Sequence, residues 1–160
     1  MPAVAFCAVL CVSLLPADGP PPVPDAAQTP PEEQAVQAAA AFWTAAREGR
    51  TEEMERLSAV PWSYYGQSVA ADRKQLVRLL ALIAEPTRNL AETCPAVVEA
   101  RSWEAVRRRN PDWAARTGLD AILKPGDFCV LVGRGPGEPG CDFIFVRMGG
   151  GAPKVVGLSH

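Results

Sequence analysis

Apolar side chains recur at three- and four-residue spacing in the first part of the chain, which predicts helices that bury one face. The first such stripe runs from Val36 to Ala46. Thr29 is placed to cap its start, Pro30 fits the first helical position, and Gly49 follows as a stop signal. We therefore expect a first helix that starts at Thr29-Pro30 and ends at Gly49.

Three further segments have helical character. A short helix opens at Thr51 with two glutamates, whose charge suits a helix N-terminus, and ends before Pro61. Asp72, with a glutamine three residues later, opens a third helix that Pro86 is expected to end. The pattern of residues 104–123 also predicts a helix, interrupted where a proline follows an asparagine.

The remaining segments are rich in β-branched and aromatic residues, which favour strands. They cover residues 61–66, 96–103, 128–133, 141–148 and 154–159. Only glycine- and proline-rich loops separate the last three, which predicts a three-stranded antiparallel meander. Because helices come first and most strands follow, we expect an α+β single domain whose N-terminal helices pack on a curved antiparallel sheet.

The N-terminus differs in composition from this domain. Ala3 to Leu15 is an uncharged, mainly apolar run with the length of a signal-peptide core, shorter than the roughly 20 residues of a membrane span. We interpret residues 1–17 as a signal-peptide-like leader, 18–31 as a proline-rich linker and 32–160 as the domain. The protein is then exported, to the periplasm, the cell surface or the medium, without a stable transmembrane span. A retained anchor and a cytosolic protein are the alternatives.

Charge and cysteine content narrow the function. The net charge of −2 gives no reason to expect a nucleic-acid partner, and Arg107–Arg109 is interpreted as a solvated helix face. Outside the leader, three cysteines remain, which predicts one disulfide and one free thiol in an oxidising compartment. Isolated cysteines with one terminal histidine do not form a metal site, and no cofactor is expected.

The expected hairpin register limits which cysteines can pair. If Val132 lies opposite Asp142, Cys129 lies on the order of 13 Å from Cys141, too far for a disulfide. Cys94 can then pair with one of the other two, and Cys94–Cys141 is favoured over Cys94–Cys129.

Three short segments together resemble the SnoaL-like, nuclear transport factor two-like superfamily. They are A-R-E-G-R at 46–50, P-W-S-Y-Y-G at 61–66 and K-V-V-G-L at 154–158. The resemblance covers Pro31 to His160. It implies a strongly curved sheet wrapped by helices into a cone with an open, partly apolar mouth. Some members isomerise or cyclise ketones there, and others only bind.

Candidate ligand-binding residues follow from that resemblance and from the strand pattern. Tyr64 and Tyr65 would lie near the cone's mouth, where alternation along a strand points one ring inward and the other outward. A buried phenol can donate a hydrogen bond to a ligand carbonyl; alternatively, both rings belong to the core. Asp142 could face the same cavity, or form a carboxylate pair with Asp127.

The expected function is a non-enzymatic binding module for a small apolar ligand or an envelope protein. One alternative is an isomerase- or cyclase-like enzyme that uses a pocket tyrosine and Asp142. Another is a structural or interaction domain without a pocket. The sequence assigns no catalytic residue.

Overall fold

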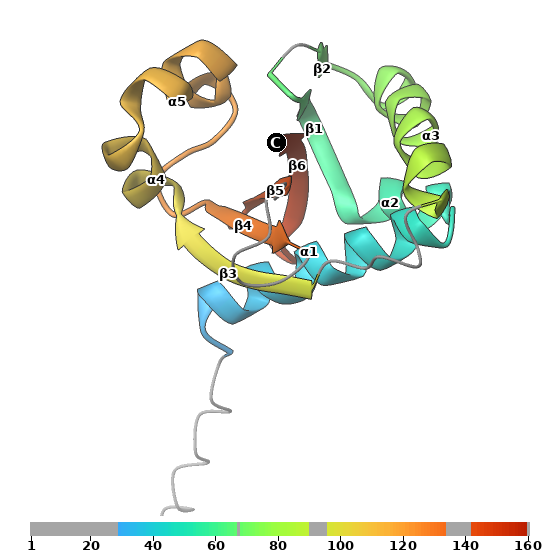
Figure 1. The fold of residues 1–160 in the computed structure, drawn as a ribbon, viewed down its shortest axis with the longest axis horizontal. Helices are drawn as coiled ribbons and strands as arrows, with labels where there is room; N and C mark the ends of the chain where they lie inside the picture. The colour runs from blue at the N-terminus through green and yellow to red at the C-terminus, as the bar shows by residue number, and fades with distance from the viewer. Residues whose placement is uncertain (1–28, 67, 90–95, 134–141, 160) are drawn as a thin grey trace, which may run out of the picture.

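The computed structural model describes residues 29–66, 68–89, 96–133 and 142–159 (Figure 1). The leader, most of the linker, Cys94, Cys141 and His160 lie outside these residues. The helices are α1 Pro31–Arg47, α2 Thr51–Leu57, α3 Arg73–Asn89, α4 Trp103–Arg109, α5 Pro111–Thr117 and the short 3-10 helix η2 Leu119–Ala121. The strands are β1 Ser58–Tyr64, β2 Ser68–Ala70, β3 Ala96–Ser102, β4 Phe128–Gly133, β5 Asp142–Arg147 and β6 Lys154–Ser159. The α+β class is confirmed.

All six strands belong to one open sheet in the order β2-β1-β6-β5-β4-β3. The predicted meander of β4, β5 and β6 is confirmed, and so is its register, with Val132 opposite Asp142 and Cys129 opposite Phe145. The prediction of an antiparallel sheet is wrong at one point, because β1 pairs with β6 in parallel. No hairpin connects these two strands, so turn geometry does not fix their relative direction, and the sheet is mixed.

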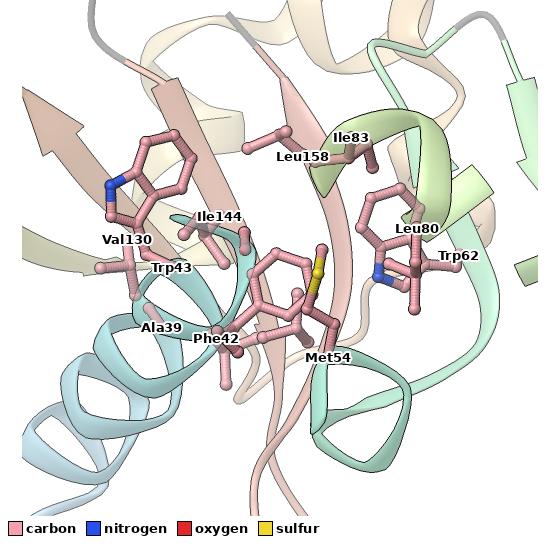
Figure 2. Packing of buried hydrophobic residues seen from close by; sticks show 14 of the residues in the cluster. Ala39, Phe42, Trp43, Met54, Trp62, Leu80, Ile83, Val130, Ile144 and Leu158 are labelled. Carbon is pink, nitrogen blue, oxygen red and sulfur yellow. The ribbon is translucent and has the colours of Figure 1, made fainter. Parts of the chain in front are cut away.

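One face of the sheet is covered by α1 and α3. Figure 2 shows the rings of Phe42 and Trp43 from α1 lying over the sheet, with Met54, Trp62 and Leu80 beside them. Phe42 and Trp62 are fully buried, and their ring centroids lie 6.3 Å apart. The predicted stripe is confirmed in part: Ala39, Trp43 and Ala46 are buried, whereas Val36 and Ala40 are only half-buried. Ala35, Phe42 and Ala45 complete the buried face instead.

The opposite face is covered by α4, α5 and η2. Trp103, Leu119, Phe145 and Val156 are buried there in a second apolar cluster. The rings of Trp103 and Phe145 meet edge to face, with centroids 6.5 Å apart. In Figure 1 these helices stand on the far side of the domain from α3. Helices therefore lie on both faces of the sheet.

The helix boundaries agree with the sequence signals only in part. Gly49 has a φ of 67° just beyond α1, and Arg50 donates its backbone N–H to the Ala45 carbonyl at 2.8 Å, as expected for a glycine stop. At the start of α1, however, Pro30 is the cap and no side chain caps the helix, so the predicted Thr29 cap is wrong.

The start of α3 follows the sequence, and its end does not. Asp72 accepts the backbone N–H of Gln75 at 2.8 Å, which confirms it as the cap of α3. The Gln75 side chain accepts the N–H of Ala71 at 2.9 Å, one residue before the cap, so the box is a variant of the usual one. The helix then continues past Pro86 to Asn89. A proline removes one helical hydrogen bond, and here that loss does not end the helix.

Candidate functional site

The structure brings the three predicted ligand-binding residues together. Tyr64 ends β1, and Tyr65 leaves the strand with a φ of 52°. The backbone N–H of Tyr65 donates to the Leu158 carbonyl at 2.7 Å, which fixes this turn against β6. The two rings meet edge to face with centroids 4.3 Å apart. The prediction that one ring points inward and the other outward is wrong, because Tyr65 no longer follows the strand.

The surroundings of Tyr65 keep its phenol neutral. Burial raises the pKa of Tyr65, and the negative charge of Asp142 raises it further. The Tyr64 ring adds to this shift, partly through a hydrogen bond between the two phenols. Oδ1 of Asp142 is shielded from solvent at the start of β5. A neutral tyrosine beside a carboxylate could donate a proton or a hydrogen bond to a ligand.

A cavity beside these residues would be needed for such chemistry. Among the described residues, Tyr64, Tyr65 and Asp142 do not line the cavity formed by α4, α5 and the sheet, nor the three hollows that border α3. In that part of the chain, the three residues form a half-buried polar junction at one end of β1, β5 and β6.

The proposed pairing of Asp127 with Asp142 is wrong. Asp127 precedes β4, whereas Asp142 lies opposite Val132 near the far end of that strand. Five residues of strand separate the two positions, on the order of 16 Å at 3.3 Å per residue. Asp127 is instead a structural residue: its carboxylate accepts the backbone N–H groups of Lys124 at 2.8 Å and Met148 at 2.9 Å.

A cavity of about 410 Å³ lies on the other face of the sheet, between the helices α4 and α5 and the strands β3, β4 and β5. The helices contribute Ala105, Val106, Arg109, Asn110 and Trp113. The sheet contributes Arg101, Cys129, Leu131 and Phe143. Most of its wall is apolar, and both cations are exposed at its mouth.

Local sequence signals explain how the helices come to cover these strands. Ser102 ends β3 and caps α4 by accepting the N–H of Ala105 at 3.3 Å. Pro111 then interrupts the helix and starts α5 at its first position. The chain therefore turns at Asn110, and α5 places Trp113 against β5, with ring centroids 5.8 Å from Phe143. Because the helix breaks at Asn110, both α4 and α5 can contribute side chains to the cavity above the sheet.

Charges at the mouth of the cavity come from three residues. Arg101 binds Glu99 through two hydrogen bonds, at 2.8 and 2.7 Å. The hydrogen bonds from Arg101 lower the pKa of Glu99, and the charge of Arg109 adds to this effect. Arg109 makes no hydrogen bond or ion pair with the rest of the described chain. Two cations thus line the mouth, and the anion Glu99, which does not itself line the cavity, is paired with Arg101.

Cys129 forms part of the cavity floor as a buried free thiol. Burial raises the pKa of this thiol to about 12, although the positive charge of Arg101 acts in the opposite direction. The sulfur is therefore protonated at neutral pH and is a poor nucleophile. The predicted alternative Cys94–Cys129 is wrong, because Cys129 is a free thiol. The favoured pair Cys94–Cys141 involves two residues outside the described chain, so it stays a prediction.

Within the described residues, no three metal-ligating side chains form a group, and no helix is long and apolar enough to cross a membrane. In comparisons with protein-family models, curated proteins and solved structures, nothing matched this chain. The cavity and the residues around it are therefore the features from which a function can be inferred.

Sequence reasoning missed the cavity because it involves elements far apart in the chain. Alternation along β4 and β5 already placed Cys129, Leu131 and Phe143 on one face. The sequence pattern predicts only a solvated face for the triple arginine segment and assigns no role to Trp113. No local signal indicated that Arg109 and Trp113 would cover that face of the sheet.

Proposed function

We propose that this protein is a binding domain for small, largely apolar molecules, which enter the cavity between α4–α5 and the sheet. The observation that carries this proposal is the cavity itself. Its volume of about 410 Å³ falls within the roughly 300–1,000 Å³ of small-molecule sites. Its walls combine aromatic and aliphatic side chains with a few polar groups, as ligand sites generally do.

The class of the domain and its location belong to the same proposal. The order of its helices and strands supports a cone-type α+β domain like that of the SnoaL-like superfamily. The leader of residues 1–17 supports export, which would give the protein access to ligands outside the cytoplasm.

Binding can be tested with phenylnaphthylamine, an uncharged dye whose fluorescence rises in apolar surroundings. We expect saturable binding to the intact protein. Ala105→Phe adds a ring to the cavity wall and should weaken dye binding strongly, because the new ring takes up part of the roughly 410 Å³ that the dye would fill. Ala115→Phe is the matched control, since Ala115 is exposed on α5 and does not line the cavity. Absence of binding, or equal loss in both variants, would contradict the proposal.

The contact of Tyr64 and Tyr65, with Asp142 close by, favours an isomerase- or cyclase-like enzyme as a second candidate. Such an enzyme needs a substrate beside the Tyr65 phenol. Incubating the intact protein with a β,γ-unsaturated ketone tests this, because the conjugated product absorbs in the ultraviolet. Turnover that is lost in Tyr65→Phe and retained in Ala105→Phe would replace the binding function with the enzymatic one.

A further inference from the structure

The two arginines at the mouth of the cavity differ in whether they have an ion-pair partner. Glu99 neutralises Arg101 through a two-bonded ion pair, with the Arg101 Nη2 at 2.7 Å from the Glu99 carboxylate. Arg109 has no such partner among the described residues, and its side chain lines the cavity. No acidic side chain lines the cavity. One unpaired positive charge is therefore left at the entrance.

A polar side chain stands beside that charge. Asn110 precedes α5 in the cap position, where an asparagine usually accepts a helix N–H. Its side chain does not cap the helix and instead lines the cavity. An amide N–H next to a guanidinium provides a second donor for an oxygen atom at the mouth.

The rest of the cavity lining is mostly apolar, and its polar side-chain groups besides the two arginines and Asn110 are the Trp113 indole N–H and the Cys129 thiol. The Trp113 ring contacts the rings of Phe143 and Phe145, at centroid distances of 5.8 and 6.2 Å, and Leu131 also lines the cavity. The Cys129 thiol is only a weak hydrogen-bond donor. A ligand that fills this space must have an apolar body, and only its outer end can reach the donors.

From this polarity we infer that the ligand is a small organic carboxylate, whose charged end pairs with Arg109 and Asn110 while its apolar body lies against Trp113 and Phe143. This inference rests on the proposed function, because it names the class of ligand for the same cavity. A planar guanidinium binds a carboxylate through two parallel N–H donors. A cationic ligand would be repelled by the positive charge of Arg109, and a neutral ligand would leave the Arg109 guanidinium with water as its only partner.

The test measures how well decanoate and decanol displace phenylnaphthylamine from the intact protein. The two competitors share a ten-carbon chain and differ in the charged group. The midpoint is the competitor concentration that displaces half of the bound dye. We expect Arg109→Gln to raise this concentration for decanoate about fivefold, equivalent to about 1 kcal/mol for a partly exposed ion pair. The midpoint for decanol should not change.

Arg108→Gln is the matched control, because it removes the same charge from the same helix. Arg108 is exposed and does not line the cavity. Its decanoate midpoint should stay within about twofold of the unaltered protein, since exposed charges are screened by salt. Added salt should weaken decanoate and leave decanol unaffected.

The outcomes separate this inference from the proposed function. If Arg108→Gln and Arg109→Gln change decanoate displacement equally, or if neither changes it, the inference of a carboxylate ligand is wrong. Dye binding by the cavity would still support the proposed function. Equal weakening of decanoate and decanol by Arg109→Gln would also overturn the carboxylate inference, because the loss would then reflect the cavity's shape. Failure of the dye itself to bind would remove the proposed function.

Discussion

Asp127 is a buried carboxylate that ties the turn before β4 to the end of β5, and its removal tests how this end of the sheet is held. Its side chain is 1% exposed. One oxygen accepts the N–H of Lys124 and the other that of Met148, while its backbone carbonyl accepts the N–H of Trp103 at 2.8 Å. Asp127→Ala leaves the backbone bond and removes both side-chain bonds.

The expected loss follows from those two bonds. A hydrogen bond to a charged group contributes about 1.5–3 kcal/mol net. Burying the carboxylate costs desolvation energy, and the alanine variant no longer has this cost, which offsets part of the two hydrogen-bond contributions. We therefore expect a loss of about 3 kcal/mol in the free energy of unfolding. For a domain of this size that corresponds to a fall of about 10 °C in Tm. Asp127→Asn should lose nearly as much, because its NH₂ group would face a backbone N–H.

Urea unfolding followed by tryptophan fluorescence measures the difference. Asp120→Ala is the control, because Asp120 is partly exposed and makes a single ion pair with Arg107 at 3.1 Å. Such a pair contributes less than about 1 kcal/mol. If Asp127→Ala costs no more than Asp120→Ala, or if Asp127→Asn is neutral, the two-bond account of Asp127 is wrong.

Two further predictions concern the sheet and the tyrosine contact. Gly157→Ala places a Cβ 2.8 Å from the Ser63 carbonyl oxygen and should cost about 1–3 kcal/mol of stability; an unchanged Tm would show that β1 and β6 can separate. The pKa of Tyr65 is raised in the folded protein, so above pH 10.0, the ordinary value, the unfolded chain loses the phenol proton before the folded protein does. The free energy of unfolding should therefore be constant below that pH and fall above it. Tyr65→Phe should flatten this decline in unfolding midpoints measured across the alkaline range, and an identical decline in both proteins would refute the shift.

Local signals in the sequence determined much of the fold. The helix start at Asp72 and the stop at Gly49 act within a few residues, and local spacing predicts both. The apolar stripe of α1 is predicted only in part, since Phe42 is buried and Val36 is only half-buried. The meander of β4, β5 and β6 is also predicted from the sequence, and the register assumed for it, with Val132 opposite Asp142, agrees with the structure.

Tertiary structure decided the rest, because the deciding contacts join distant segments. The parallel pairing of β1 with β6 brings Ser63 beside Gly157, and no local pattern records that direction. Tyr65 turns toward Tyr64 only because its backbone bonds to Leu158. The cavity exists because a break at Asn110 folds α4 and α5 over a face whose residues lie later in the chain. Periodicity shows which side of an element is apolar, and only packing shows what that side meets.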